Sequence, residues 1–125
     1  MKRTRKYYEL MGQLEERGID TTPELMETYC KIRKLAMKHH RLAEMDCNGE
    51  GFVHGKFYRC DGSVPGSYLE DGETTIFCAE QEKIEERISA LVSTIGLKVE
   101  YQGDPRGCTV RLSTMEGKFV PIPFA

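Results

Sequence analysis

The chain has 125 residues, of which 39% are hydrophobic, and its 18 Lys and Arg against 20 Asp and Glu give a net charge of −2. This length is typical of a single domain with one hydrophobic core, so we expect one domain over 1–125. No stretch approaches the roughly 20 apolar residues of a membrane helix. The basic start 1–6 is not followed by the apolar stretch of a signal peptide. We therefore expect a cytoplasmic protein with no membrane partner.

The cysteines favour a reducing compartment. Their number is odd, their spacing is irregular, and none forms a CxxC pair; they are Cys30, Cys47, Cys60, Cys78 and Cys108. A secreted disulfide scaffold usually has an even count and a zinc finger usually has close pairs. We expect reduced thiols.

Charge is distributed unevenly along the chain. Residues 1–41 hold ten Lys or Arg and six acidic residues, whereas the remainder carries a net charge of −6. A basic first third suits an anionic partner, although proteins without such a partner also show this asymmetry.

Helical periodicity predicts two N-terminal helices joined as an antiparallel hairpin over 5–46. The first spans about 5–17, ends at Gly18, and has Tyr7, Leu10, Met11 and Leu14 on one face. Thr22 and Pro23 begin the second, because threonine caps free amides and proline suits the first helical position. Its apolar face consists of Leu25, Tyr29, Ile32, Ala36 and Ala43.

The remaining elements follow from glycine positions and changes of period. Glycines interrupt 47–75, which we expect to form a short hairpin around Gly55 or a functional loop. A third helix is predicted over 76–95, with Phe77, Ile84, Ile88, Leu91, Val92 and Ile95 facing inward. Alternating residues predict a β-hairpin over 97–112, and the proline-containing tail 113–125 supplies an edge strand at best. The predicted class is α+β: a helical hairpin, a third helix and a small antiparallel C-terminal sheet.

The segment Asp104-Pro105-Arg106-Gly107 has the composition of a type I turn. Turn geometry explains every residue except Arg106, whose guanidinium would project from the hairpin tip. At the hairpin tip this guanidinium could bind a phosphate or carboxylate, with Asp104 and Tyr101 beside Arg106 in the site. A purely structural turn is the alternative.

Two short motifs carry a resemblance to a known family. Cys47-Asn48-Gly49 follows the second helix, and residues 96–112 read GLKVEYQGDPRGCTVRL. Over about 30–112 the chain resembles a family of small uncharacterised phage and prophage proteins with a "CNG" after a helix and a "DPRG" strand-turn-strand. The resemblance implies a phage accessory gene, a class rich in host-takeover and counter-defence factors, but implies no settled activity.

Basic residues form a row on the second predicted helix. Lys31, Lys34, Lys38 and Arg41 fall within about 80° of one another at 100° per residue. Four such cations could follow a phosphate backbone. The alternative is a solvated outer face, with Glu27 on the same side.

Metal binding and catalysis have less support. Zinc would need Cys47, His54, Cys60 and Cys78 to converge, and structural zinc sites generally include a close cysteine pair, so we predict no cofactor and keep zinc as an alternative. His39 lies at the edge of the apolar face, where we expect a semi-buried histidine. No P-loop, GxGxxG, HExxH or GxSxG motif is present. The acidic residues of the third helix, Glu80, Glu82, Glu85 and Glu86, are expected to be solvated.

Two functional hypotheses follow. The first is a non-enzymatic phage or prophage accessory protein, with counter-defence among its roles, that binds a host protein or a small anionic ligand such as a nucleotide. Its site would combine Arg106, Asp104 and Tyr101 with the row Lys31, Lys34, Lys38 and Arg41. The alternative is a nucleic-acid-binding regulator that uses the basic N-terminal arm and the second helix. The sequence leaves open whether the chain forms a homo-oligomer.

Overall fold

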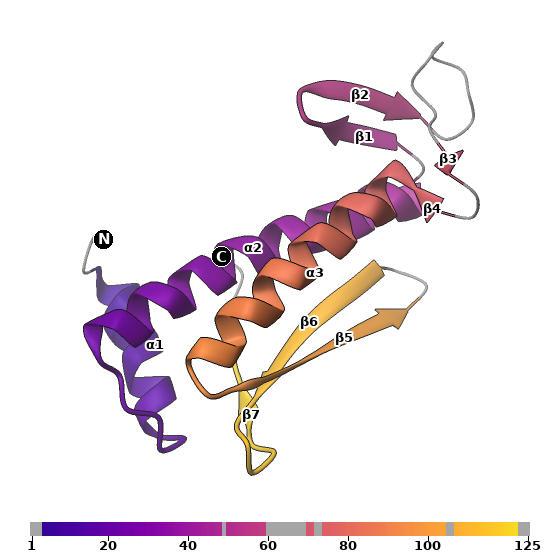
Figure 1. Cartoon of the computed structure of the whole chain (residues 1–125). Coiled ribbons are helices and arrows are strands. Elements are labelled where there is room, and N and C mark those ends of the chain that lie inside the picture. Colours follow the sequence, from indigo (N-terminus) through magenta and orange to yellow (C-terminus); the bar gives the residue numbers. More distant parts are fainter. Residues whose placement is uncertain (1–3, 49, 60–69, 72–73, 105–106, 123–125) are drawn as a thin grey trace.

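The structure is a computed structural model, and it describes residues 4–48, 50–59, 70–71, 74–104 and 107–122 (Figure 1). The helices in this part of the chain are α1 (Arg5–Glu15), α2 (Pro23–Asn48) and α3 (Ile76–Thr94). The strands are β1 (Glu50–Val53), β2 (Lys56–Arg59), β3 (Glu70–Asp71), β4 (Thr74–Thr75), β5 (Lys98–Asp104), β6 (Gly107–Ser113) and β7 (Phe119–Val120). The predicted α+β class is confirmed.

The predicted helices form at the expected places. The Thr4 hydroxyl accepts a hydrogen bond from the Tyr7 amide at the start of α1, and the Thr22 hydroxyl accepts one from the Leu25 amide at the start of α2. The packing differs from expectation in one respect, because the long antiparallel pair is α2 with α3, while α1 crosses the beginning of α2 (Figure 1). Since α1 spans about 16 Å and α2 about 39 Å, α1 is too short to cover α2, and the remainder of α2 packs against α3 and β6.

The C-terminal sheet has the antiparallel order β5-β6-β7. The β5–β6 hairpin runs without interruption from Lys98 opposite Ser113 to Asp104 opposite Gly107, which confirms the predicted hairpin. The tail contributes the two-residue edge strand β7, with Val120 opposite Leu112. Strand β6 packs against α2, so the sheet forms a second layer beneath the helix pair (Figure 1).

The glycine-rich segment contains the expected hairpin. Strands β1 and β2 pair around His54 and Gly55, whose φ angles are 50° and 77°. Positive φ at both central residues is what a two-residue type I′ turn requires, and His54 is an uncommon residue to adopt it. Strands β3 and β4 form a second short antiparallel pair.

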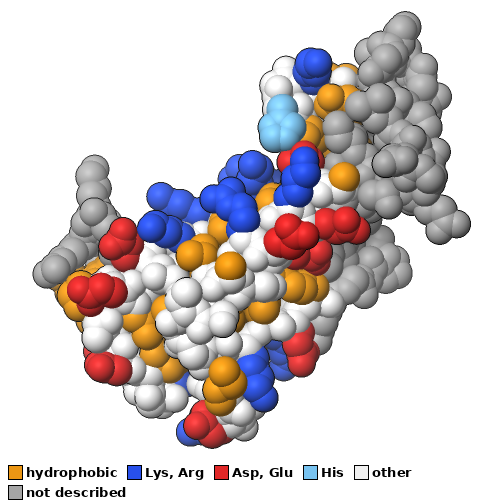
Figure 2. All heavy atoms as spheres, viewed as in Figure 1, with side chains coloured by type: hydrophobic (Ala, Val, Ile, Leu, Met, Phe, Trp, Pro, Cys, Tyr) orange, Lys and Arg blue, Asp and Glu red, His pale blue; other side chains and the backbone are white. Residues whose placement is uncertain are grey.

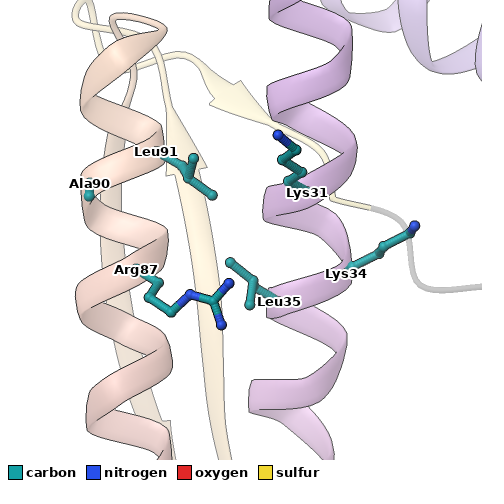
Figure 3. A pocket seen from close by; sticks show the side chains of 6 residues that line it. All are labelled: Lys31, Lys34, Leu35, Arg87, Ala90 and Leu91. Carbon is teal, nitrogen blue, oxygen red and sulfur yellow. The ribbon is translucent and has the colours of Figure 1, made fainter. Parts of the chain in front are cut away.

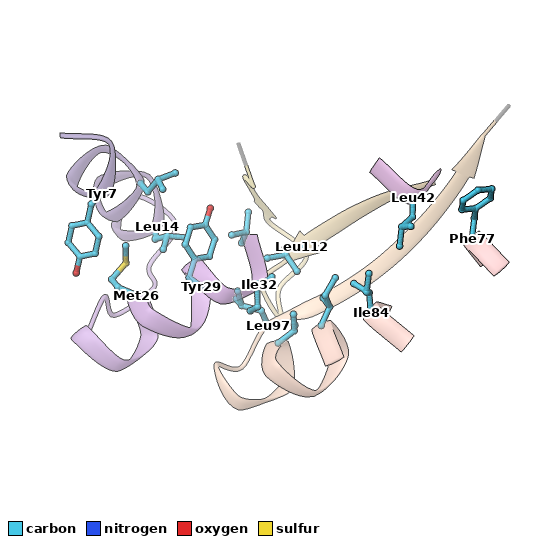
Figure 4. Packing of buried hydrophobic residues seen from close by; sticks show 14 of the residues in the cluster. Tyr7, Leu14, Met26, Tyr29, Ile32, Leu42, Phe77, Ile84, Leu97 and Leu112 are labelled. Atoms are coloured by element: carbon cyan, nitrogen blue, oxygen red, sulfur yellow. The ribbon is translucent and has the colours of Figure 1, made fainter. Parts of the chain in front are cut away.

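One hydrophobic core joins the three helices and the sheet (Figure 4). Its largest fully buried side chains are Tyr29, Phe77, Leu14, Met26, Ile32, Ile88, Leu112, Val92 and Val120. The inward positions predicted for the third helix are buried or half-buried, as expected. In α2 the register differs slightly, because Met26 is buried while Leu25 is half-buried.

Tyr29 ties α2 to the C-terminal tail. Its side chain is 1% exposed, and its hydroxyl donates a hydrogen bond to the backbone oxygen of Pro121. Burial raises the pKa of the Tyr29 hydroxyl from 10.0 to about 12. The positive charges of Arg33 and Arg17 lower this pKa, but their effect is smaller than that of burial. The group therefore contributes stability that is complete below pH 10 and is lost as pH rises toward 12.

We expect Tyr29→Phe to lower the free energy of unfolding at pH 7 by about 1–2 kcal/mol, because the Pro121 carbonyl loses its donor. The variant should also lose less stability than wild type between pH 10 and 12. Chemical denaturation across that range measures both effects. Tyr8→Phe is the control. Because Tyr8 is 52% exposed, this substitution should change neither the free energy of unfolding at pH 7 nor its loss between pH 10 and 12. An unchanged alkaline profile in Tyr29→Phe would contradict this role.

Candidate functional site

An open groove of about 560 Å³ lies between α2 and α3. Its lining consists of Lys31, Lys34 and Leu35 from α2 and of Arg87, Ala90 and Leu91 from α3 (Figure 3). The two helices contribute residues at the same spacing of i, i+3 and i+4, which places each set of three on one helix face. The groove therefore follows directly from the antiparallel packing of two short, matching sequence patterns.

The lining separates into an apolar floor and a basic rim. Leu35 and Leu91 lie in the gap between the helices, and Arg87 extends from α3 toward Leu35 (Figure 3). Lys31 and Lys34 stand on α2, and both are exposed. The groove thus offers apolar contact and positive charge to the same ligand.

Little of this positive charge is neutralised by the described residues. Lys31 lies 3.6 Å from Oε1 of Glu27, and both side chains are more than 60% exposed, so the pair is weak. Lys34 and Arg87 form no ion pair within the described part of the chain. Lys and Arg side chains gather over this region in Figure 2. Such a patch attracts anions.

The structure separates the predicted row of cations. Lys31 and Lys34 line the groove, while Lys38 and Arg41 lie exposed further along α2 and do not line it. The sequence interpretation missed Arg87, because it assigned a role to the apolar and the acidic residues of α3 but not to its basic ones. The signal was present: Arg87 and Leu91 repeat on α3 the i, i+4 pattern of Lys31 and Leu35 on α2.

The site residues predicted near the β5–β6 turn, Arg106, Asp104 and Tyr101, are not among the described residues that line the groove. Arg106 lies outside the described residues, and for Asp104 the backbone alone is described, at the end of β5. Tyr101 is half-buried, and its hydroxyl donates to the backbone oxygen of Glu85 at 2.7 Å and contacts Oγ of Ser89 at 2.8 Å. Tyr101 thus anchors β5 to α3. A ligand contact by Arg106 stays a prediction.

Two glutamates of α3 are not solvated as predicted. The Glu85 side chain is 26% exposed, and its Oε1 lies 3.2 Å from Nε2 of His39 without the alignment of a hydrogen bond. His39 is completely buried rather than semi-buried, and its ring lies 5.8 Å from that of Tyr101. The Glu80 side chain is 12% exposed and lies 3.0 Å from Nε2 of His54. Both glutamates face histidines from other elements, which the sequence could not show.

The Glu80–His54 pair fastens the tip of the β1–β2 hairpin to α3. Partial burial alone would raise the pKa of Glu80, but hydrogen bonds from His54 and Lys83 and their charges outweigh burial and lower it. A carboxyl with a lowered pKa contributes stability that is present above its unfolded pKa and is lost as pH falls through its folded pKa. The hairpin contact should therefore weaken in acid.

We expect Glu80→Gln to lose less stability than wild type when pH falls below 4.5, the ordinary pKa of this carboxyl. Urea denaturation at neutral pH and at successively lower pH measures the difference. Glu82→Gln is the matched control, because Glu82 is an exposed glutamate of the same helix. Identical acid profiles for Glu80→Gln and Glu82→Gln would show that Glu80 has no special role.

The zinc alternative is not supported by the described side chains. His54 binds Glu80, while Cys60 and the side chains of Cys47 and Cys78 lie outside the described part of the structure. Within that part, no group of three or more His, Cys, Asp or Glu side chains could hold a metal ion. Cys30 is a half-buried free thiol.

Comparison with known proteins gives no assignment: no family model, curated protein or solved structure matches the chain. Among the helices in the described residues, none is sufficiently long and apolar to cross a membrane.

Proposed function

We propose that this protein is a non-enzymatic binding protein that holds a small organic anion in the groove between α2 and α3. The supporting observation is that Lys31 and Lys34 of α2 and Arg87 of α3 line a groove that also contains Leu35 and Leu91, with Arg87 directed toward Leu35 and Lys34 extending away from α3 (Figure 3). A volume of about 560 Å³ falls within the range of small-molecule sites. A ligand with a planar or apolar body and a phosphate or carboxylate group would use both parts of the groove, and a nucleotide has this chemistry.

The lining also suggests the selectivity of the site. None of its six described residues carries a neutral amide or hydroxyl side chain that could recognise the hydrogen-bonding pattern of a base. The groove should therefore distinguish ligands by charge and apolar area rather than by base identity. We expect ATP and GTP to bind alike, and we expect adenosine, which lacks phosphate, to bind much more weakly.

Isothermal titration calorimetry with ATP, GTP, AMP and adenosine tests this proposal. ATP and GTP should bind with similar affinity and one-to-one stoichiometry, AMP more weakly, and binding should weaken as salt screens the charges. No hydrolysis product should form. Equal binding of adenosine and ATP, or no binding of either at millimolar concentration, would rule out an anion site of this kind.

The nucleic-acid-binding regulator remains a second candidate because of the exposed row on α2. From Lys31 to Arg41 the row spans about 15 Å of helix, enough to contact several phosphates. In the N-terminal arm, Arg5 lies 3.3 Å from Glu9, and this exposed ion pair is weak, as is the pair of Lys31 with Glu27. Lys38→Glu with Arg41→Glu, both outside the groove, should abolish duplex DNA binding in a fluorescence anisotropy assay if this candidate is right. The same pair of changes should leave ATP binding nearly intact.

The wider setting of the proposal comes from the resemblance alone. A phage or prophage accessory protein in the host cytoplasm would act stoichiometrically, with counter-defence as one outcome and a host protein as the other class of partner. The absence of a recognisable catalytic motif supports a binding role over a catalytic one.

A further inference from the structure

A second cavity, of about 310 Å³, lies at the end of the molecule away from the β1–β2 hairpin. Three connections meet there: the loop between α1 and α2, the turn between α3 and β5, and the turn between β6 and β7 (Figure 1). They contribute residues 17–20, 95–97 and 114–116, and Leu25 from the first turn of α2 completes the lining. This cavity shares no residue with the groove between α2 and α3.

The C-termini of α1 and α3 both end at this cavity, and both helices are closed in the same way. Gly18 and Gly96 lie in the left-handed region, with φ angles of 76° and 69°. The amide of the next residue, Ile19 or Leu97, then donates to a backbone oxygen in the last turn of its helix. A helix C-terminus carries about half an elementary negative charge, because its last carbonyls have no partner within the helix. Two such ends make the cavity attractive to positive charge.

Two carboxylates from different connections also line the cavity. Asp20 belongs to the loop after α1 and Glu116 to the turn after β6, and both are exposed. Neither forms an ion pair with another residue in the described part of the chain. Arg17 lines the cavity as well, but its guanidinium is held by backbone oxygens: Nε donates to Phe119 at 2.6 Å and Nη1 donates to Gln13 at 2.7 Å. Two carboxylates and two helix ends outweigh the single charge of Arg17.

Most of the remaining side chains at the cavity are apolar: Ile19, Leu25, Ile95, Leu97 and Met115. The first turn of α2 would bring an opposite partial charge, but the Thr22 hydroxyl accepts a hydrogen bond from the Leu25 amide, and Glu24 lies in that turn. A volume of about 310 Å³ is at the lower limit of small-molecule sites, so the ligand must be small.

We propose that this cavity binds a small organic cation, an ammonium group on a short alkyl chain. The ammonium group pairs with Asp20 and Glu116 beside the two helix ends, and the chain packs against the apolar side chains. The apolar lining favours an alkylammonium over a metal ion, because it buries CH₂ groups and offers no ligand to a metal. Cation binding here and anion binding in the groove are separate properties, and each can fail without the other.

Pentylamine, pentanol and pentanoate share one alkyl chain and differ in the polar group, so together they test the proposal. The ¹⁵N-labelled protein is titrated with each compound at neutral pH and constant ionic strength and followed by NMR. Pentylamine alone should give saturable amide shifts at 17–20, 95–97 and 114–116, with a millimolar dissociation constant. Equal binding of pentanol and pentylamine, or no saturable shift with pentylamine, would overturn the proposal.

Asp20→Asn with Glu116→Gln should weaken pentylamine binding about tenfold or more. Both side chains are exposed, so the unfolding temperature should stay nearly unchanged. Glu82→Gln with Glu86→Gln is the matched control, because it removes the same charge from two exposed glutamates of α3 that do not line the cavity. The control should change the affinity by less than about twofold. An equal loss in the two double variants would mean that pentylamine responds to net charge, and the proposal would fail.

Discussion

Reversing the charges of Lys34 and Arg87 together is expected to lower the affinity for ATP about a hundredfold. Each contact of an exposed cation with phosphate contributes about 1 kcal/mol, and reversal replaces attraction by repulsion. Both side chains are exposed and neither has an ion pair within the described residues, so Lys34→Glu with Arg87→Glu should leave the unfolding temperature nearly unchanged. Calorimetric titration and thermal unfolding of the same sample measure the two effects.

Lys118→Glu is the matched control for this experiment. Lys118 is an exposed lysine of the turn before β7 and is remote in sequence from the groove. Lys118→Glu changes the net charge by the same amount as Lys34→Glu or Arg87→Glu. It should alter ATP affinity by less than about threefold, through long-range charge alone. An equal loss of affinity in Lys118→Glu and in Arg87→Glu alone would mean that ATP responds to net charge and not to the groove.

Replacing Phe77 with alanine is expected to destabilise the fold by about 3–5 kcal/mol, the usual cost of deleting a buried aromatic ring. Phe77 is fully buried in the first turn of α3, and its ring meets the Tyr58 ring edge-on at 6.4 Å. It therefore joins α3 to the β1–β2 hairpin. The loss is a large share of the 5–15 kcal/mol typical of a domain, and we expect the unfolding temperature to fall by roughly 10–20 °C.

Phe52→Ala removes the same ring from an exposed position and serves as the control. Phe52 is 64% exposed on the β1–β2 hairpin and contacts Phe57 across the strands. Its loss should cost less than about 1 kcal/mol, the scale of one cross-strand pair. Comparable losses of stability in Phe77→Ala and Phe52→Ala would show that the hairpin and α3 do not pack as described.

The fold was largely predictable because its elements are signalled by local patterns. Thr22 and Pro23 start α2, Gly96 follows α3, and alternating residues give the β5–β6 hairpin at the expected place. Which helices pair was less predictable, because tertiary packing decides it. Although α1 and α2 are joined by a short loop, α3 is the longer partner and provides the apolar face that covers most of α2.

The candidate site was predictable only on the side of α2. Lys31 and Lys34 stand out as a row within one helix, which periodicity reveals. Arg87 comes from a helix about fifty residues further along, and its position opposite Leu35 depends on the packing of α2 against α3. The pairing of His54 with Glu80 likewise joins a hairpin to a helix, and no local sequence pattern predicts such a contact.

Titration of the ¹⁵N-labelled protein with ATP, followed residue by residue by NMR, tests the anion-binding groove most directly. We predict that the largest amide shifts fall on α2 around Lys31–Leu35 and on α3 around Arg87–Leu91, with saturation at one equivalent. The Lys34→Glu, Arg87→Glu protein should show neither set of shifts. Shifts confined to the turn between β5 and β6 would locate the site at Arg106 instead, and no shift at millimolar ATP would contradict anion binding in the groove.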